Sequence, residues 1–303
     1  MIRRAIKEKL HPRNRFRDGY NFAELIARSP DLAAFVAPNA YGDASVDYAN
    51  PAAVKALNQA LLKDAYGLDA WDVPPGYLVP PVPGRSDYLH HLADLIAPGR
   101  DHKSSRAASA VVLDVGMGAN AIYPIVGASE YGWRFVGSEI DRVALAWAQK
   151  LVASNPSVTY LIECRLQASP TECFRGIVRT GETFDASMCN PPFHTSAADA
   201  AESTQRKQRR LAAGGTSRKT SVQNFGGKAG ELWCDGGELG FIRRMIDQSA
   251  PMSRQVRWFT TLVSKSANLP VLREALRGVR AVDVRVIEMS QGQKKSRILA
   301  WKF

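Results

Sequence analysis

From residue 110 onward, short apolar runs alternate with segments in which apolar residues recur every three or four positions. The runs predict buried strands, and the longer spacing predicts amphipathic helices. Strands are expected at 110–115, 133–139, 158–164, 184–189, 255–263, 281–288 and 296–302. Helices are expected at 119–130, 141–154, 170–178, 238–250 and 268–277. Such alternation predicts an α/β fold, with a mostly parallel seven-stranded sheet covered by helices on both faces.

The last two predicted strands are separated only by residues 291–295, which are too few for a helix. These strands are therefore expected to form an antiparallel hairpin at the edge of the sheet.

The first third of the chain lacks this alternation. Helix-like spacing appears at 21–36, 51–66 and 86–97, and a proline-rich stretch at 73–84 precedes the last of these. The polar segment 98–109 marks a boundary. The pattern predicts a small helical, substrate-binding N-terminal region at 1–108. A sheet domain is expected at 109–303, with a basic insert at 199–230.

The composition narrows the class of partner. The chain has 303 residues, 45% of them hydrophobic, and a formal net charge of +11. That balance favours a polyanionic partner, with nucleic acid first. The four cysteines show no C-x-x-C spacing, which indicates reduced thiols in a cytoplasmic protein and neither a zinc site nor a disulfide framework. Residues 1–17 lack the apolar core of a signal peptide, and no apolar run approaches membrane-spanning length.

Two basic segments are candidate RNA-binding surfaces. Residues 1–17 contain seven Lys or Arg against one acid, Glu8, with Phe16 among them. Between Glu202 and Glu231 there are seven Lys or Arg and no acid. Such segments suit phosphate contacts, and a solvated arm and a surface excursion are the alternatives. The residues expected to contact RNA are Arg13, Arg15, Arg17, Arg206, Lys207, Arg209, Arg210, Arg218 and Lys219.

The tetrapeptide Asn190-Pro191-Pro192-Phe193 ends a predicted buried strand. Neither proline can donate to a ladder, so the chain must leave the sheet at Asn190, at the edge where α/β sheets bind ligands. The Asn190 side-chain oxygen and the Pro191 carbonyl can each accept an N–H from an exocyclic amine such as N6 of adenine. Phe193 can stack on the base. An ordinary strand-ending turn is the alternative.

A glycine turn follows the first strand of the sheet. Gly116 and Gly118 let the backbone pass close to a ligand, which suits either a dinucleotide or S-adenosylmethionine. Asp114 would repel a pyrophosphate but suits the cationic methionyl end of S-adenosylmethionine. Glu139, at the end of the second strand, is placed to accept hydrogen bonds from ribose hydroxyls. The alternative is a solvent-exposed turn at Glu139 beside a helix cap at Asp141.

These features resemble the class I, Rossmann-like amino-methyltransferases, and six motifs resemble one family, the bacterial 23S rRNA adenine-N6 methyltransferases. The motifs span nearly the whole chain, at 11–14, 81–88, 116–124, 190–194, 236–239 and 291–293. The resemblance implies that Arg85 holds the carboxylate of S-adenosylmethionine. It also implies that Gly116 and Asn120 line the methionyl pocket and that Glu139 binds the ribose. The end of the third strand, 164–167, lacks the acid that many methyltransferases place near the cofactor adenine.

The chain is therefore interpreted as an S-adenosylmethionine-dependent methyltransferase acting on N6 of one adenine in 23S rRNA, free or within an assembling large subunit. The reaction is expected to need neither a metal nor a membrane. One alternative is a protein glutamine methyltransferase, against which Phe193 in place of the usual Tyr argues. The others are a nicotinamide-dependent dehydrogenase, and an RNA-binding module without catalysis, which should have lost Asn190 or Asp114. Trp233 is either a core residue or a substrate contact.

Overall fold

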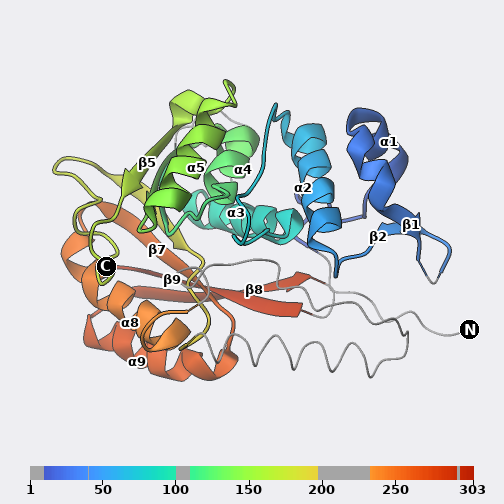
Figure 1. The fold of residues 1–303 in the computed structure, drawn as a ribbon. Helices are drawn as coiled ribbons and strands as arrows, with labels where there is room; N and C mark the ends of the chain where they lie inside the picture. Colours follow the sequence, from blue (N-terminus) through green and yellow to red (C-terminus); the bar gives the residue numbers. More distant parts are fainter. Residues whose placement is uncertain (1–9, 40, 100–109, 197–232, 292–293) are drawn as a thin grey trace, which may run out of the picture.

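The structure, a computed structural model, describes residues 10–39, 41–99, 110–196, 233–291 and 294–303 (Figure 1). Its centre is a seven-stranded sheet in the order β5-β4-β3-β6-β7-β9-β8. These strands are β3 (Val111–Val115), β4 (Arg134–Glu139), β5 (Ile162–Leu166), β6 (Phe184–Cys189), β7 (Val256–Val263), β8 (Asp283–Gln291) and β9 (Lys294–Lys302). Neighbours from β5 to β7 run parallel, and β9 runs antiparallel to both β7 and β8. The predicted sheet and C-terminal hairpin are confirmed, with β8 as the outer strand.

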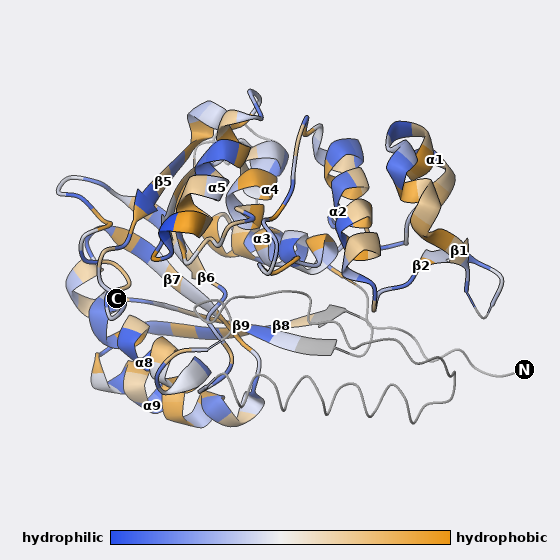
Figure 2. Ribbon diagram, in the orientation of Figure 1, coloured by the Kyte–Doolittle hydropathy of each residue, from blue (hydrophilic) through white to orange (hydrophobic). Residues whose placement is uncertain are grey.

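Helices cover both faces of the sheet (Figure 1). One face carries α3 (Val82–Ile96), α4 (Ile122–Tyr131) and α5 (Arg142–Ala153), and the other carries α8 (Gly237–Ser249) and α9 (Leu269–Gly278). Side chains alternate along β3, so Val112 belongs to the core cluster that contains α4, whereas Leu113 belongs to the cluster that contains α8. The ribbons of α5, α8 and α9 alternate between hydrophobic and hydrophilic segments, as helices with one buried side do (Figure 2).

The N-terminal region packs onto the α3–α4 face as part of the same hydrophobic core. It consists of α1 (Phe22–Arg28), a small hairpin of β1 (Val36–Pro38) and β2 (Ala44–Val46), and α2 (Pro51–Tyr66). The predicted single helix at 21–36 was wrong. The α conformation is disfavoured before proline, so the helix ends before Ser29, which has φ −139° and ψ 79°, and a 3₁₀ turn follows over Pro30–Phe35. The hairpin was not predicted.

The proline-rich stretch ends earlier than predicted. Helix α3 begins at Val82, with Pro83 in its first turn, where a proline needs no N–H partner. Strand β5 begins at Ile162, later than predicted, because a 3₁₀ turn occupies Thr159–Leu161.

The predicted helix at 170–178 is instead a series of turns. Side chains from other elements bind its backbone: Gln248 of α8 accepts from Cys173 N and donates to Thr171 O, both at 2.7 Å. Gly176 has a φ of +83°, which a right-handed helix excludes. Within the described parts of the chain, no helix is long and apolar enough to cross a membrane.

Candidate active site

A cavity of about 440 Å³ opens at the carboxyl ends of β3, β4 and β6. It brings together seven of the predicted site residues: Arg85, Gly116, Gly118, Asn120, Glu139, Asn190 and Pro192. Asp114 lies buried next to the glycine turn, and Pro191 and Phe193 do not line the cavity. These residues come from four separate segments, so the cavity exists only because the sheet aligns the ends of its parallel strands.

The glycine turn is attached to the end of β4 by its backbone. Gly116 N and Met117 N both donate to Ser138 O, at 3.1 and 3.0 Å, and Gly118 N donates to Glu139 Oε2 at 2.9 Å. Gly116 and Gly118 have φ values of +77° and +69°, a region that glycine adopts without strain. The turn therefore presents its backbone to the cavity in a fixed conformation.

Glu139 is buried, not part of an exposed turn. Its second oxygen accepts from Ile140 N at 2.8 Å and from Asp141 N at 2.9 Å. Burial raises the pKa of the Glu139 carboxyl, and the three backbone donors oppose that rise. A carboxylate has about four lone-pair sites, so Glu139 can still accept from a hydroxyl. Asp141 is the N-cap of α5, as the alternative interpretation held.

Asp114 is a fully buried acid on the α3 side of β3. Neither carboxylate oxygen has a hydrogen-bond partner in the described chain. Burial raises the pKa of Asp114 to about 8, the charge of Arg85 lowers it, and Glu139 raises it. A buried carboxylate without partners is costly, so this position favours a cationic ligand.

Arg85 reaches the cavity from the first turns of α3. Its Nη1 donates to the hydroxyl of Tyr123 at 2.6 Å, and its Cζ lies 5.3 Å from the centre of that ring. Its buried Nε has no partner among the described residues. An unpaired guanidinium N–H beside an unpaired carboxylate is a donor set that fits the carboxylate and the ammonium of an amino-acid moiety.

Asn190 ends β6 with its side-chain oxygen buried and, in the described chain, without a hydrogen-bond donor. The chain that follows is held by residues 233–237. His194 forms a parallel bridge with Trp233, and Cys234 N donates to His194 O at 3.1 Å. At Gly237 a side chain would meet Thr195 Cγ2 at 2.9 Å. Gly237 is therefore needed for the close packing of residues 236–238 against Thr195, which follows the tetrapeptide.

Comparison with known proteins assigns the chain to a family. The profile of a family described as RNA methyltransferase matches residues 4–303. The chain is 53% identical over 297 residues to Ribosomal RNA large subunit methyltransferase F of Serratia proteamaculans, covering 98% of this chain and 88% of that protein. The protein of the same name in Pseudomonas syringae is 52% identical, with 98% and 90% covered. The chain belongs to this RNA methyltransferase family.

Solved structures of related proteins share the fold. The hMettl16 catalytic domain in complex with MAT2A 3'UTR hairpin 1 is 31% identical, with a TM-score of 0.82 over 98% of this chain and 96% of that one. The N-terminal domain of human METTL16 in complex with SAH is 29% identical, with a TM-score of 0.75 and 97% and 98% covered. The class I, Rossmann-like methyltransferase fold expected for this family member is confirmed.

Of the two basic segments of this chain, the structure describes only part of the first. Arg206, Lys207, Arg209, Arg210, Arg218 and Lys219 lie outside the described residues. Arg15 is half exposed, donating to Glu130 at 2.7 Å and to Ala65 O at 2.9 Å. Arg17 has a buried Nε without a described partner. Arg13 is bound within the protein, to Asp94 and two other groups, and its phosphate contact stays a prediction.

Sequence reasoning did not assign several residues that shape the site. Glu238 accepts from Ser264 N, Lys265 N and Asn268 Nδ2, which ties α8 to the loop after β7. Its motif was noticed, but its partners lie about 30 positions away. Trp233 lines the cavity, and its buried Nε1 has no partner among the described residues. Arg165 points to Glu163 and Glu182, and Gln167 lines the cavity at the end of β5.

Proposed function

We propose that this family member transfers a methyl group from S-adenosylmethionine to the exocyclic N6 of an adenine in the RNA of the large ribosomal subunit. The observation that carries the proposal is Asn190. Its buried, unpaired side-chain oxygen shares one cavity with Arg85 and Glu139 and lies beside Pro191 and Pro192. This acceptor makes no hydrogen bond within the described chain and suits an N–H of a substrate amine.

The described residues fit S-adenosylmethionine. Asp114 would face the ammonium and Arg85 the carboxylate of the amino-acid end, because each has a buried polar atom that lacks a partner. Gly116, Gly118 and Asn120 would line the methionyl part, and Glu139 would accept from the ribose hydroxyls. Gln167 lines the cavity at the end of β5, where an acid is common, and its amide is bonded to Arg175 O and Ser169 N.

The chain's own groups would align and activate the amine. The lone pair of N6 is delocalised into the purine ring, which makes the amine a weak nucleophile. The Asn190 oxygen and the Pro191 carbonyl would each accept one N–H, which favours a pyramidal nitrogen with its lone pair free for attack. Phe193 would stack on the base and hold its plane, worth roughly 1–3 kcal/mol. The bound cofactor supplies the methyl group on an electrophilic sulfonium, so alignment is the main requirement.

The partner is proposed from charge and from the relatives. The relatives from Serratia proteamaculans and Pseudomonas syringae are named as ribosomal RNA large subunit methyltransferases, and this chain has a formal net charge of +11. Arg13, Arg15, Arg17 and the basic insert are the proposed phosphate contacts. A base must leave its stack to reach a pocket of this kind, and RNA loops present such bases most readily. We propose that the reaction takes place in the cytoplasm and needs no metal.

The test is methyl transfer from labelled S-adenosylmethionine to ribosomal RNA that lacks its modifications. We expect label on adenine N6 with the wild type. We expect a loss of roughly 100-fold or more with Asn190→Ala, by analogy with the loss of one oxyanion-hole hydrogen bond in other enzymes. Asn155→Ala is the matched control, because Asn155 is also buried but does not line the cavity and instead bonds the backbone of residues 69–70.

Other outcomes separate the alternatives. Label on an added protein instead of RNA would identify a glutamine methyltransferase. Tight RNA binding without transfer to free RNA or to assembling subunits would identify a binding module.

A further inference from the structure

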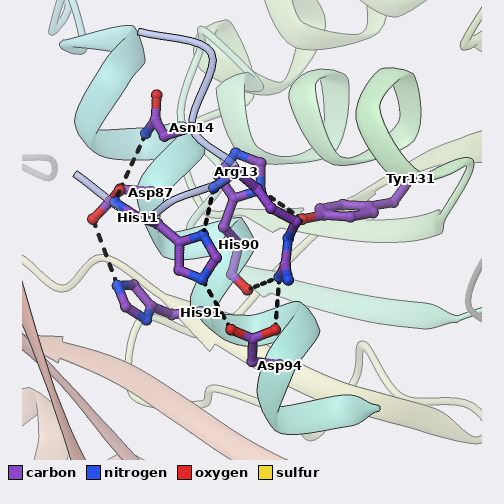
Figure 3. Close-up of polar contacts among 8 residues, drawn as sticks. All are labelled: His11, Arg13, Asn14, Asp87, His90, His91, Asp94 and Tyr131. Atoms are coloured by element: carbon purple, nitrogen blue, oxygen red, sulfur yellow. Dashed lines mark hydrogen bonds and ion pairs between the residues drawn. The ribbon is translucent and has the colours of Figure 1, made fainter. Parts of the chain in front are cut away.

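Three of the first described residues of the chain, His11, Arg13 and Asn14, are bonded to α3 (Figure 3). His11 N donates to Asp87 Oδ1 at 2.7 Å. Asn14 Nδ2 donates to Pro83 O at 2.9 Å and to the same Asp87 oxygen at 3.1 Å. Asn14 and Asp87 are 4% and 1% exposed, so these bonds are made out of water. The side-chain oxygen of Asn14 accepts from Phe16 N at 3.0 Å, which fixes the orientation of its amide.

These bonds are made at both ends of the turn of α3 that carries Arg85. Pro83 and Asp87 lie two residues before and two residues after Arg85 in the same helix. From the other side, Asn58 of α2 donates to Pro80 O at 2.6 Å, just before the helix begins. The turn is therefore held at both ends by buried amides, whereas Arg85 itself points into the cavity and to Tyr123.

A second set of bonds extends the attachment by two turns. His11 Nε2 lies 2.9 Å from Asp94 Oδ2, and Arg13 Nη2 donates to Asp94 Oδ1 at 2.8 Å and to His90 O at 2.9 Å. Burial, followed by the charges of His11, Arg13 and His91, lowers the pKa of His90 to about 3. His90 is therefore neutral at physiological pH and does not repel Arg13.

We propose that the motif 11–14 positions Arg85 for the cofactor, with Asn14 and Asp87 as the central pair. The role of Arg85 rests on the proposed function above. A guanidinium binds a carboxylate best when its direction is fixed before binding, because less freedom is lost. The Asn14–Asp87 pair fixes the position of the helix turn, and the turn fixes the position of the Cα of Arg85. Tyr123 fixes the position of the guanidinium at the other end of the side chain.

This proposal differs from a purely structural role in what it predicts. If the motif had a purely structural role, disrupting it would lower the free energy of unfolding and leave the affinity of the folded protein for the cofactor unchanged. If the motif positions Arg85, disrupting it raises the dissociation constant of the folded protein for S-adenosylmethionine, even without RNA. A phosphate-binding role for the motif would instead weaken RNA binding and reduce its salt dependence.

The experiment measures binding of labelled S-adenosylmethionine to the full chain by equilibrium dialysis, without RNA. Asn14→Asp places a second carboxylate against Asp87 and removes both donors. We expect its dissociation constant to rise roughly tenfold or more, with kcat at saturating cofactor changed far less. Adding Asp87→Asn restores a donor and acceptor pair and should recover part of the affinity. Asn155→Asp, a buried asparagine away from Arg85, should bind the cofactor as the wild type does.

Three results would overturn the inference. One is unchanged cofactor affinity in Asn14→Asp, with or without a change in RNA binding. Another is an equal loss of cofactor affinity in Asn155→Asp. The third is a wild type that does not bind S-adenosylmethionine, which would overturn the proposed function as well. If the wild type and Asn14→Asp bind equally, only the positioning role fails.

Discussion

Arg85 and Tyr123 form a bonded pair in which Nη1 lies 2.6 Å from the phenol oxygen and the guanidinium lies 5.3 Å from the ring centre. The two residues come from different helices, α3 and α4, on the same face of the sheet. Burial raises the pKa of Tyr123 to about 12, so the phenol keeps its proton and accepts from Arg85 as a neutral group. The pair directs one edge of the guanidinium and leaves Nε available.

Tyr123→Phe keeps the ring beside Arg85 and removes the oxygen. A hydrogen bond to a charged group contributes about 1.5–3 kcal/mol. We therefore expect the dissociation constant for S-adenosylmethionine to rise roughly tenfold or more, measured by equilibrium dialysis. Trp147→Phe is the control, because its indole donates to Asp72 O and contacts neither Arg85 nor its turn of α3. Equal weakening in both variants would contradict a specific role for Tyr123.

Gly137→Ala should disturb the glycine turn by displacing Met117, which lies between Gly116 and Gly118. A Cβ at Gly137 in β4 would lie 2.3 Å from Met117 Sδ, and Met117 lines the cavity. Overpacking of this kind costs about 1–3 kcal/mol of unfolding free energy. We expect that loss in chemical denaturation, together with weaker cofactor binding. Gly278→Ala meets nothing within 4 Å at the end of α9 and should leave both quantities nearly unchanged.

Asp114 predicts a pH dependence of stability in the protein without cofactor. An unfolded Asp titrates near pH 3.9, and burial raises the pKa of folded Asp114 to about 8. Between these values the folded state holds a proton that the unfolded state has released, so this group's contribution to stability falls as the pH rises. Asp114→Asn cannot ionise. Its unfolding free energy relative to the wild type should rise from about pH 4 to about pH 8, measured by urea denaturation.

A flat difference between the two proteins over that range would show that Asp114 is ionised throughout. In that case a bound water or ion would have to supply the partners that the described residues do not.

Trp233→Phe tests whether the unpaired indole contacts the substrate. The change keeps an aromatic ring in the cavity and removes the Nε1 donor. If that donor meets an acceptor on the base, losing about 1 kcal/mol lowers kcat/KM for RNA roughly fivefold. Trp147→Phe loses a bond from its indole to Asp72 O at 3.0 Å and should lower stability without changing kcat/KM. An unchanged kcat/KM in Trp233→Phe would make Trp233 a packing residue.

The hydrophobic pattern predicted the sheet because strands that are buried on both faces leave a strong local signal. It failed at 170–178 for an equally physical reason. Cys173, Phe174 and Ile177 have helical spacing and are buried, but they are held in turns by partners such as Gln248. Spacing reports which side chains are buried and not which backbone carries them.

The glycine turn and the tetrapeptide could be recognised because each lies within a few consecutive residues. The contacts of Arg13 could not, because Asp94 is 81 positions away in the sequence. Charge alone favoured a phosphate ligand at Arg13, and only the packing of the N-terminal segment on α3 shows an internal partner. The same limit applies to Glu238, whose partners lie in another loop.

Strand β9 lies between β7 and β8, and β8 pairs with no other strand in the described chain. During synthesis, β8 therefore leaves the ribosome with no strand to join until β9 has followed it. The hydrophobic core on the α8 face is also incomplete without β9, because Trp301 of β9 is buried there. Its indole donates to Ser249 Oγ at 2.9 Å and stacks on Phe259. The seven-stranded sheet can therefore be completed only after residue 302 has been translated, and the core between the sheet and α8 is completed in the same step.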